Sequence, residues 1–375
     1  MNPSRAVVDV HILQTLPPSC LNRDDTGAPK SAIYGGARRA RVSSQSWKRA
    51  TRRYFNEHLA DNAMGVRTRK LSELFVERLS QRLGARATDQ MARVIELANR
   101  ASGVLVGVKP NVLKKLAESE QPADLPYALF ISGSAIDAAM DHLVSAFDGA
   151  DLDEEALKQA MGEGHSLDVA LFGRMIADTP ELNIDAACQV AHAISTHRVS
   201  SEFDFYTTVD DLAGEEESGA AMMGYVEFNS ATLYRYATVS LGRLADNLGT
   251  TVNVASGVRA FIEGFVKSLP TGHQNTFAAM TLPDVVFVAL RGDQPLSLVG
   301  AFEAPIEGSA GYVAESARRM AEHVSHIESL YGVPRVNGWA TYATTAGELD
   351  SALGPSMSFP DLLDSVEAAA ARVHL

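Results

Sequence analysis

Apolar and polar residues alternate near both ends of the chain, whereas the middle follows the period of an amphipathic helix. In residues 6–14, Val8, Val10 and Ile12 point one way and the polar residues between them the other, which predicts a half-buried strand. The Leu-Pro-Pro run at residues 16–18 is expected to end this strand.

Residues 62–179 are expected to form a helical subdomain, because their apolar positions recur with a helical period and strand patterns are scarce. Residues 184–196 are predicted to form another helix, with small packing residues. Residues 203–209 alternate again, and residues 223–241 form a much longer strand pattern. Because that strand exceeds the usual ~5–6 residues, we expect a hairpin arm that projects from the body, with residues 210–221 as its exposed loop.

The last third of the chain mixes both patterns. Helices are predicted at residues 252–269 and 310–331, strands at 285–290 and 296–304, and a terminal helix from about Phe359. The order strand, helix, strands, helix and strand thus recurs across the two ends, with the helical block between them. This order suits an α+β fold with a sheet of the βαββαβ kind, split by insertions.

Charge is distributed unevenly along the chain. The 375 residues include 33 Lys and Arg against 46 Asp and Glu, which gives a formal net charge of −13. Residues 26–53, the basic island, contain no acidic residue but eight cationic ones: Lys30, Arg38, Arg39, Arg41, Lys48, Arg49, Arg52 and Arg53. A dense basic segment in an acidic chain is typical of binding to a polyanion, most often nucleic acid, along a single face.

A helix is predicted within the basic island, from about residue 45 to about residue 59, with Ser43 placed to cap its first turn. At ~100° per residue four polar side chains share one face of it: Gln45, Lys48, Arg49 and Arg52. A helix N-terminus flanked by Ser and Gln, with cations one turn further on, suits a phosphate group. The alternative is that these side chains form an ordinary solvent-exposed helix face that binds no ligand.

The sequence offers little that points to catalysis. There is no P-loop, GxGxxG, HExxH or GxSxG motif, and the histidines are scattered, so no metal or cofactor is expected. Asp24 and Asp25 form the one carboxylate pair beside basic residues. They could hold Mg²⁺ for phosphodiester cleavage, or they could orient Arg23 or cap the loop.

Two further features of the sequence indicate the cellular compartment. Cys20 and Cys188 are the only cysteines, which gives no disulfide framework and fits a reducing cytoplasm. No apolar run approaches the ~20 residues of a membrane span, and the N-terminus lacks a signal-peptide pattern. A cytoplasmic protein without a membrane partner is therefore expected.

Six segments carry a family resemblance: PSCLNRDD, AIYGGARRARVSSQSWKRA, DVALFGRM, AHAISTHRV, DFYTTVDDL and EFNSATLYRYA. In their order they resemble the backbone subunit of the type I-E CRISPR Cascade complex, the CasC family. The resemblance implies a right-hand shape with an RRM/ferredoxin-like palm, helical fingers and a β-hairpin thumb. Residues 1–60 and 181–375 would form the palm, residues 61–180 the fingers, and residues 200–229 the thumb.

The resemblance also implies a function without catalysis. Copies of the subunit would stack head to tail along a guide RNA (crRNA) beside other Cascade subunits. Each thumb would displace one base, and the remaining bases would be free to pair with target DNA. Guide processing and target cleavage would belong to partner subunits.

Residue roles follow from the same resemblance. Guide phosphates would be held by Arg23, Lys30, Ser43, Gln45, Lys48 and Arg49, next to Arg52 on the same helix face. The displaced base would be lined by Met175, Phe205, Tyr206 and Thr207, and Gln274 is a further candidate. After Phe302 the family carries lysines thought to face target DNA, but here this stretch is acidic and lysine-free, which puts that contact in doubt.

Two competing interpretations remain open at this point. Related filament subunits of type III systems cut RNA with a loop aspartate, so Asp24 or Asp25 could make this chain a metal-dependent ribonuclease. A purely structural oligomer, with the basic island in a protein interface, is the other possibility.

Overall fold

The computed structural model describes residues 5–59, 64–162, 164–176, 178–208, 222–249, 253–308, 310–343 and 347–373. The chain divides into two compact units. The sheet unit comprises Met1–Tyr54, Gln189–Val239 and Val258–His374, and the helical unit comprises Phe55–Cys188 and Ser240–Gly257. The palm, fingers and thumb boundaries expected from the resemblance stay a prediction.

The sheet unit contains a nine-stranded sheet in the order β11-β10-β1-β9-β7-β3-β2, with β6 and β8 each pairing with β9 off this path. Its strands are β1 (Val7–Ser19), β2 (Ser31–Tyr34), β3 (Ala37–Val42), β6 (Cys188–Val190), β7 (Ala193–Ser195), β8 (Glu202–Thr208), β9 (Met222–Ser240), β10 (Val285–Arg291) and β11 (Asn337–Tyr342). Every pairing whose register is defined within this sheet is antiparallel.

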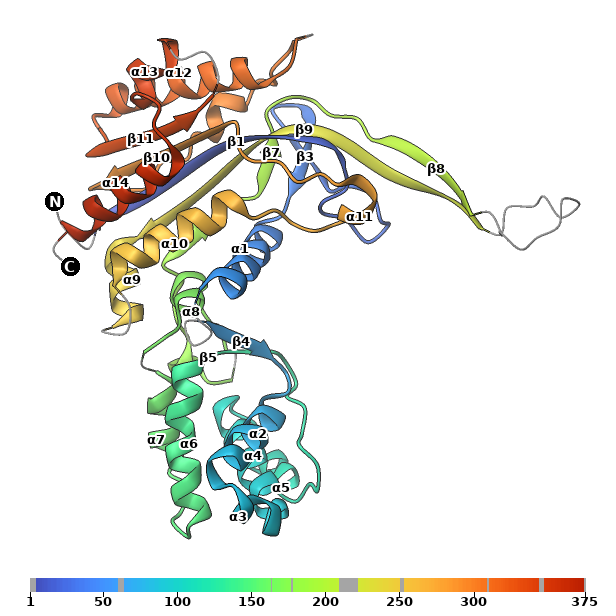
Figure 1. Ribbon diagram of the computed structural model, residues 1–375, viewed down its shortest axis with the longest axis vertical. Helices are drawn as coiled ribbons and strands as arrows, with labels where there is room; N and C mark the ends of the chain where they lie inside the picture. The colour runs from blue at the N-terminus through green and yellow to red at the C-terminus, as the bar shows by residue number, and fades with distance from the viewer. Residues whose placement is uncertain are drawn as a thin grey trace, which may run out of the picture. The chain divides into compact units, whose positions relative to one another are not determined.

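Helices of the sheet unit cover both faces of this sheet (Figure 1). On one face lie α12 (Val313–Tyr331) and α13 (Gly347–Leu353), and on the other lie α1 (Ser44–His58) and α10 (Val254–Lys267). The unit also contains α11 (Gln274–Phe277), the 3-10 turn η4 (Val299–Phe302) and α14 (Phe359–Ala371). The predicted helices at 45–59, 252–269 and 310–331 and the terminal helix are thereby confirmed.

Strand β1 differs from its prediction in two ways. Both of its faces are buried, because α12 covers the face that the polar residues Asp9 and His11 occupy. The strand also continues through Pro17 and Pro18. Its register with β10 ends at Leu13, so the prolines lie beyond that partner and their missing N–H groups cost no ladder bond on that side.

Two other predictions of secondary structure were wrong. Residues 184–196 form no helix but strands β6 and β7, because Ile194 pairs with Arg41 of β3 on one side and Tyr234 of β9 on the other. Residues 296–304 form η4 instead of a strand. Leu298 and Phe302 are both buried in the core under α12, and the Ala301 N–H donates to the Leu298 carbonyl at 3.1 Å, a turn hydrogen bond that an extended chain cannot form. Strand β11 was missed.

The predicted hairpin arm is present. β8 pairs with the first part of β9 from Glu202↔Phe228 to Thr208↔Met222, and Figure 1 shows this ribbon extending away from the sheet. All seven residues of β8 are exposed. The expected loop at 210–221 lies outside the described residues.

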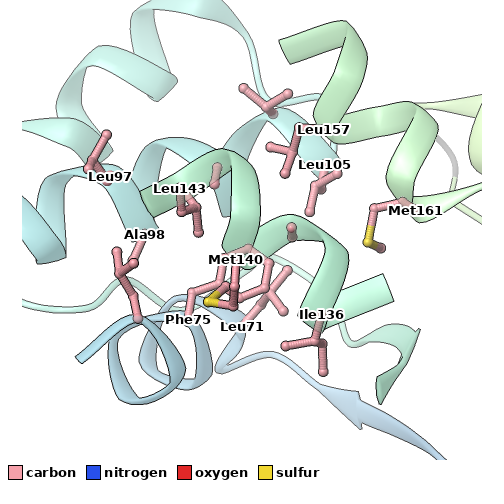
Figure 2. Close-up of a cluster of buried hydrophobic side chains, with 14 of the residues drawn as sticks. Leu71, Phe75, Leu97, Ala98, Leu105, Ile136, Met140, Leu143, Leu157 and Met161 are labelled. Atoms are coloured by element: carbon pink, nitrogen blue, oxygen red, sulfur yellow. The ribbon is translucent and has the colours of Figure 1, made fainter. Parts of the chain in front are cut away.

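The helical unit confirms the expected helical block and adds a small sheet. Its helices are α2 (Leu71–Leu83), α3 (Ala85–Asp89), α4 (Met91–Leu105), α5 (Pro110–Ala117), α6 (Gly133–Phe147), α7 (Glu154–Met161), α8 (Leu167–Phe172), the 3-10 turn η3 (Pro180–Leu182) and α9 (Leu241–Leu248). Strands β4 (Gly65–Thr68) and β5 (Leu129–Ser132) pair antiparallel. Figure 2 shows the apolar core, in which Phe75, Met140 and Leu143 are fully buried.

Two sequence expectations about the whole chain can be compared with the described residues. Cys20 and Cys188 are buried free thiols, so they form no disulfide. None of the helices in the described ranges is long and apolar enough to cross a membrane.

Candidate nucleic-acid interface

Helix α1 carries the cationic face that the sequence predicted. Ser43 caps it: its carbonyl accepts from the N–H groups of Ser46 at 3.0 Å and Trp47 at 3.2 Å, and its Oγ lies 3.4 Å from Ser46 N. Trp47 is fully buried, whereas Gln45 and Arg49 are exposed and Lys48 and Arg52 are half-buried. The first turn has no acidic residue, so no carboxylate of the helix neutralises the positive end of its dipole.

A buried arginine fixes the packing side of α1. The guanidinium carbon of Arg235, on β9, lies 3.7 Å from the centroid of the Trp47 ring and 4.6 Å from that of Phe265, on α10. It donates to Gln14 Oε1 at 2.5 Å and to the carbonyl of Phe265. Burial lowers the pKa of Arg235 to about 9. Strands β1 and β9 thus hold α1 and α10 through one planar cation.

The same network reaches the loop that follows α11. Gln14 Nε2 donates to the carbonyl of Thr281 at 2.8 Å, and Thr281 Oγ1 donates to the carbonyl of Thr15 at 2.8 Å. The amide of Gln274, the first residue of α11, accepts from the Ala279 N–H at 3.0 Å and donates to the Pro270 carbonyl at 3.4 Å, so it connects the segments on either side of this short helix. Gln274 therefore shapes the chain around α11, and its predicted RNA contact stays a prediction.

The loop at residues 22–30 is tied to the start of α1. Asn22 Oδ1 accepts from the Ser43 N–H at 2.9 Å, and the Asn22 carbonyl accepts from the Lys30 N–H at 2.9 Å. Arg23 pairs with Pro29 in an isolated bridge across the loop. The backbone thus brings Arg23 and Lys30, both predicted phosphate ligands, into the segment that is anchored at the helix cap.

Asp24 has a structural use in this loop. Its Oδ1 accepts from the N–H groups of Thr26 at 2.9 Å and Ala28 at 3.1 Å, and from the Thr26 hydroxyl at 2.7 Å. These hydrogen bonds, led by that of Thr26, lower the pKa of Asp24. The structure therefore uses Asp24 as a loop cap. Across the described ranges, no group of three His, Cys, Asp or Glu side chains could hold a metal ion.

One cation of the basic island lies inside the protein. Arg39 is fully buried and donates to the carbonyls of Ser195 and Phe302, both at 2.9 Å, and of Glu303 at 3.1 Å. The Gly35-Gly36 turn, with φ of +55° and +70°, joins β2 to β3. A Cβ on Gly35 would lie 1.6 Å from the Glu303 carbonyl oxygen. The turn therefore packs against the protein's own backbone at this glycine.

The arm presents apolar side chains to solvent on both of its faces. Phe205 and Thr207 point to one face and Tyr206 to the other, because successive residues of a strand alternate. Phe205 contacts Tyr225 of β9, with ring centroids 5.1 Å apart. The Tyr206 ring lies over Gly224, its cross-strand partner. Sequence reasoning singled out β8 and missed the exposed side chains of β9, which are Met222, Met223 and Tyr225.

Met175 belongs to the helical unit and is 84% exposed. The preceding Arg174 is buried and donates to the carbonyls of Leu182 at 2.9 Å and Met161 at 3.1 Å. Burial lowers the pKa of Arg174 to about 10. Arg174 thus anchors the backbone from which Met175 projects into solvent.

Comparison with known proteins gives the class of this chain. It matches the family model of CT1975-like proteins over residues 8–365, and it therefore belongs to that family. No curated protein matches it. A chain of a solved structure described as "CRISPR RNA-guided surveillance complex, pre-nicking" is 32% identical, with a TM-score of 0.81 and coverage of 97% of this chain and 100% of that chain.

A second solved structure, described as "CRISPR RNA-guided surveillance complex", contains a chain that is 30% identical. The TM-score is 0.63, and the match covers 97% of this chain and 99% of that chain. Together with the family match, these similarities confirm the resemblance to a Cascade-type backbone subunit.

Proposed function

We propose that this chain is a scaffold that binds the guide RNA of a CRISPR surveillance complex and polymerises head to tail along it. The observation that carries the proposal is the capped N-terminus of α1, whose exposed face bears Arg49 and Gln45 beside the loop that holds Arg23 and Lys30. This surface is basic in a chain of net charge −13. Phosphate groups along a single RNA strand are negatively charged and accept hydrogen bonds, so they match the positive charge and the donor groups of this surface.

The fold supports an RRM/ferredoxin-like palm. Four strands lie in the spatial order β10-β1-β9-β7, with α1 between β1 and β7 in the chain and α10 between β9 and β10. This is the βαββαβ succession that the sequence suggested. In the proposal the helical unit acts as the fingers and the β8–β9 ribbon as the thumb. Other Cascade subunits and, through the guide, target DNA are the further partners.

We propose that the subunit itself does not cleave nucleic acid. Asp24, the residue best placed for a ribonuclease by the sequence alone, holds a loop with three hydrogen bonds. A metal-dependent ribonuclease that uses Asp24 or Asp25 is the alternative. The expected cytoplasmic location stays a prediction.

The proposal is tested by RNA binding of the purified full chain, freed of nucleic acid at high salt. Fluorescence anisotropy with single-stranded RNAs of unrelated sequence should give similar affinities that fall steeply as salt rises, since phosphate contacts carry no sequence information. A protein that leaves the cell without RNA and binds none at low salt would instead support the structural oligomer. Binding to a single RNA sequence would also contradict a scaffold.

A further inference from the structure

Three groups that can carry positive charge meet beside the loop at residues 22–30. Arg41, on β3, donates through Nε to the Ser31 carbonyl at 3.3 Å, and one of its Nη atoms lies 3.0 Å from His192 Nδ1. The Arg41 N–H donates to the Lys30 carbonyl at 2.9 Å. His192 is exposed and lies between β6 and β7. All three residues belong to the sheet unit.

No carboxylate of the described residues forms an ion pair with this cluster. Among the described residues neither Lys30 nor Arg41 forms an ion pair, and Arg41 Nη2 has no hydrogen-bond partner there. The charged groups that face the His192 ring are Arg41, from β3, and Lys30, from the segment before β2. Partial burial first, and then these two cations, lower the pKa of His192. Like charges held together without an acid are an arrangement that a bound anion would relieve.

The hydrogen bond between the two side chains sets the tautomer of His192. A guanidinium can only donate, so Nδ1 of His192 accepts and the neutral ring carries its proton on Nε2. Protonation of Nδ1 would place two donors against each other. An anion that accepts from both groups would remove this repulsion and would therefore raise the pKa of His192.

The cluster adjoins the proposed phosphate-binding surface. A small cavity of about 20 Å³ is lined by Asn22, Lys30 and Arg41 together with mostly apolar residues. Asn22 is the residue whose side chain accepts from the Ser43 N–H at the cap of α1. An RNA strand that follows Arg23 and Lys30 toward this cap would pass directly beside Arg41.

We propose that Lys30, Arg41 and His192 form an anion subsite that takes a phosphodiester group of single-stranded RNA and binds it more tightly as His192 becomes protonated. This inference rests on the proposed RNA-binding function and adds Arg41 and His192 to it. The subsite makes the affinity for RNA depend on pH across the range in which histidine titrates.

The test compares wild-type protein with His192→Gln at about pH 8 and about pH 5.5, using single-stranded RNA of one length. Wild-type affinity should rise more than that of His192→Gln, by up to about tenfold if RNA raises the pKa of His192 by about one unit. The wild-type plot of log affinity against log salt should also steepen by ~0.7 at the lower pH, as for one added phosphate contact. The control is His326→Gln, an exposed histidine of α12, which should behave like wild type.

A direct readout is the NMR titration of His192 with and without RNA. RNA should raise its pKa in wild-type protein. In Arg41→Gln without RNA, the pKa of His192 should rise toward the ordinary value, because a neighbouring cation is gone. Equal pH dependence in wild type and His192→Gln, with RNA bound by both, would overturn the subsite alone. Absence of RNA binding at every pH would instead overturn the proposed function.

Discussion

The Arg235 guanidinium stacks on the buried face of the Trp47 ring at 3.7 Å, and it thereby links β9 to the helix that presents the cationic face. Replacing Arg235 with Met would leave Gln14 Oε1 and the Phe265 carbonyl without their buried donor. We expect the free energy of unfolding to fall by about 2–4 kcal/mol. Lysine should restore little, since it lacks the planar fork.

Chemical denaturation of Arg235→Met and Arg235→Lys measures this loss, and RNA titration of the folded variants measures its effect on α1. The matched control is Arg243→Met, an exposed arginine of α9 paired with Asp185. If the free energy of unfolding of Arg235→Met lies within about 0.5 kcal/mol of the wild-type value, the stacked arginine contributes packing volume only.

Cationic side chains on the proposed RNA surface should contribute equally to every RNA sequence. We expect Arg23→Ala, Lys48→Ala and Arg49→Ala each to weaken RNA binding. Each should also make the plot of log affinity against log salt less steep, by ~0.7 in its slope. The control is Arg78→Ala, an exposed arginine of α2 in the helical unit. Anisotropy titrations with several unrelated RNAs provide the measurement. A loss confined to particular sequences would mean that these residues read bases.

The carboxylates of the loop at residues 22–30 should not support cleavage. We expect no cutting of guide or target RNA by the subunit alone with Mg²⁺ or Mn²⁺, because Asp24 is engaged by its own loop. Labelled RNA on a denaturing gel gives the readout. Metal-dependent cleavage that disappears in Asp24→Ala or Asp25→Ala would establish the ribonuclease.

Phe205 and Tyr206 of β8 should have different roles, since they lie on opposite faces of the arm. Phe205→Ala should blur the regular pattern of displaced bases along the guide while leaving overall RNA affinity nearly intact, because an apolar wedge sets where stacking breaks. Tyr206→Ala should instead uncover Gly224 and loosen the ribbon. Chemical probing of the guide in the assembled complex separates these effects. Sharp, regularly spaced reactivity in Phe205→Ala would exclude this residue as the wedge.

A buried histidine predicts acid sensitivity of the helical unit. Burial and then Arg174 lower the pKa of His165 to about 4 from an ordinary value of 6.5. Between these values the unfolded chain binds the additional proton, so stability should fall as the pH drops from about 6.5 to about 4. Allowing for solvent screening, the loss is on the order of 2 kcal/mol. Denaturation of wild type and His165→Gln across this range tests it, and an unchanged pH dependence in the variant would contradict it.

The parts of this fold that sequence predicted well depend on local patterns. The Ser43 cap, the two faces of α1 and the long alternation of β9 are all set by neighbours within the same element. The helix expected at residues 184–196 failed because pairing of Ile194 with two distant strands overrides the helical preference of its neighbours.

Charge was the other source of error. The charge pattern predicts that the basic island lies at the surface, yet Arg39 is buried against carbonyl groups of residues more than 150 positions away. Nothing local distinguishes Arg39 from the adjacent, exposed Arg38. Arg235 is likewise indistinguishable in sequence from a surface cation, because its partners come from β1, α1 and α10.

The arm has a consequence for the life of the protein before assembly. Among the described strands β8 pairs with β9 alone, all of its residues are exposed, and Phe203, Phe205 and Tyr225 are more than half exposed. An open strand edge with aromatic side chains is prone to pair with any other chain it meets. A newly made subunit is therefore at risk of aggregation until its arm is covered. Production of the subunit should yield more soluble protein when its partners are made in the same cell.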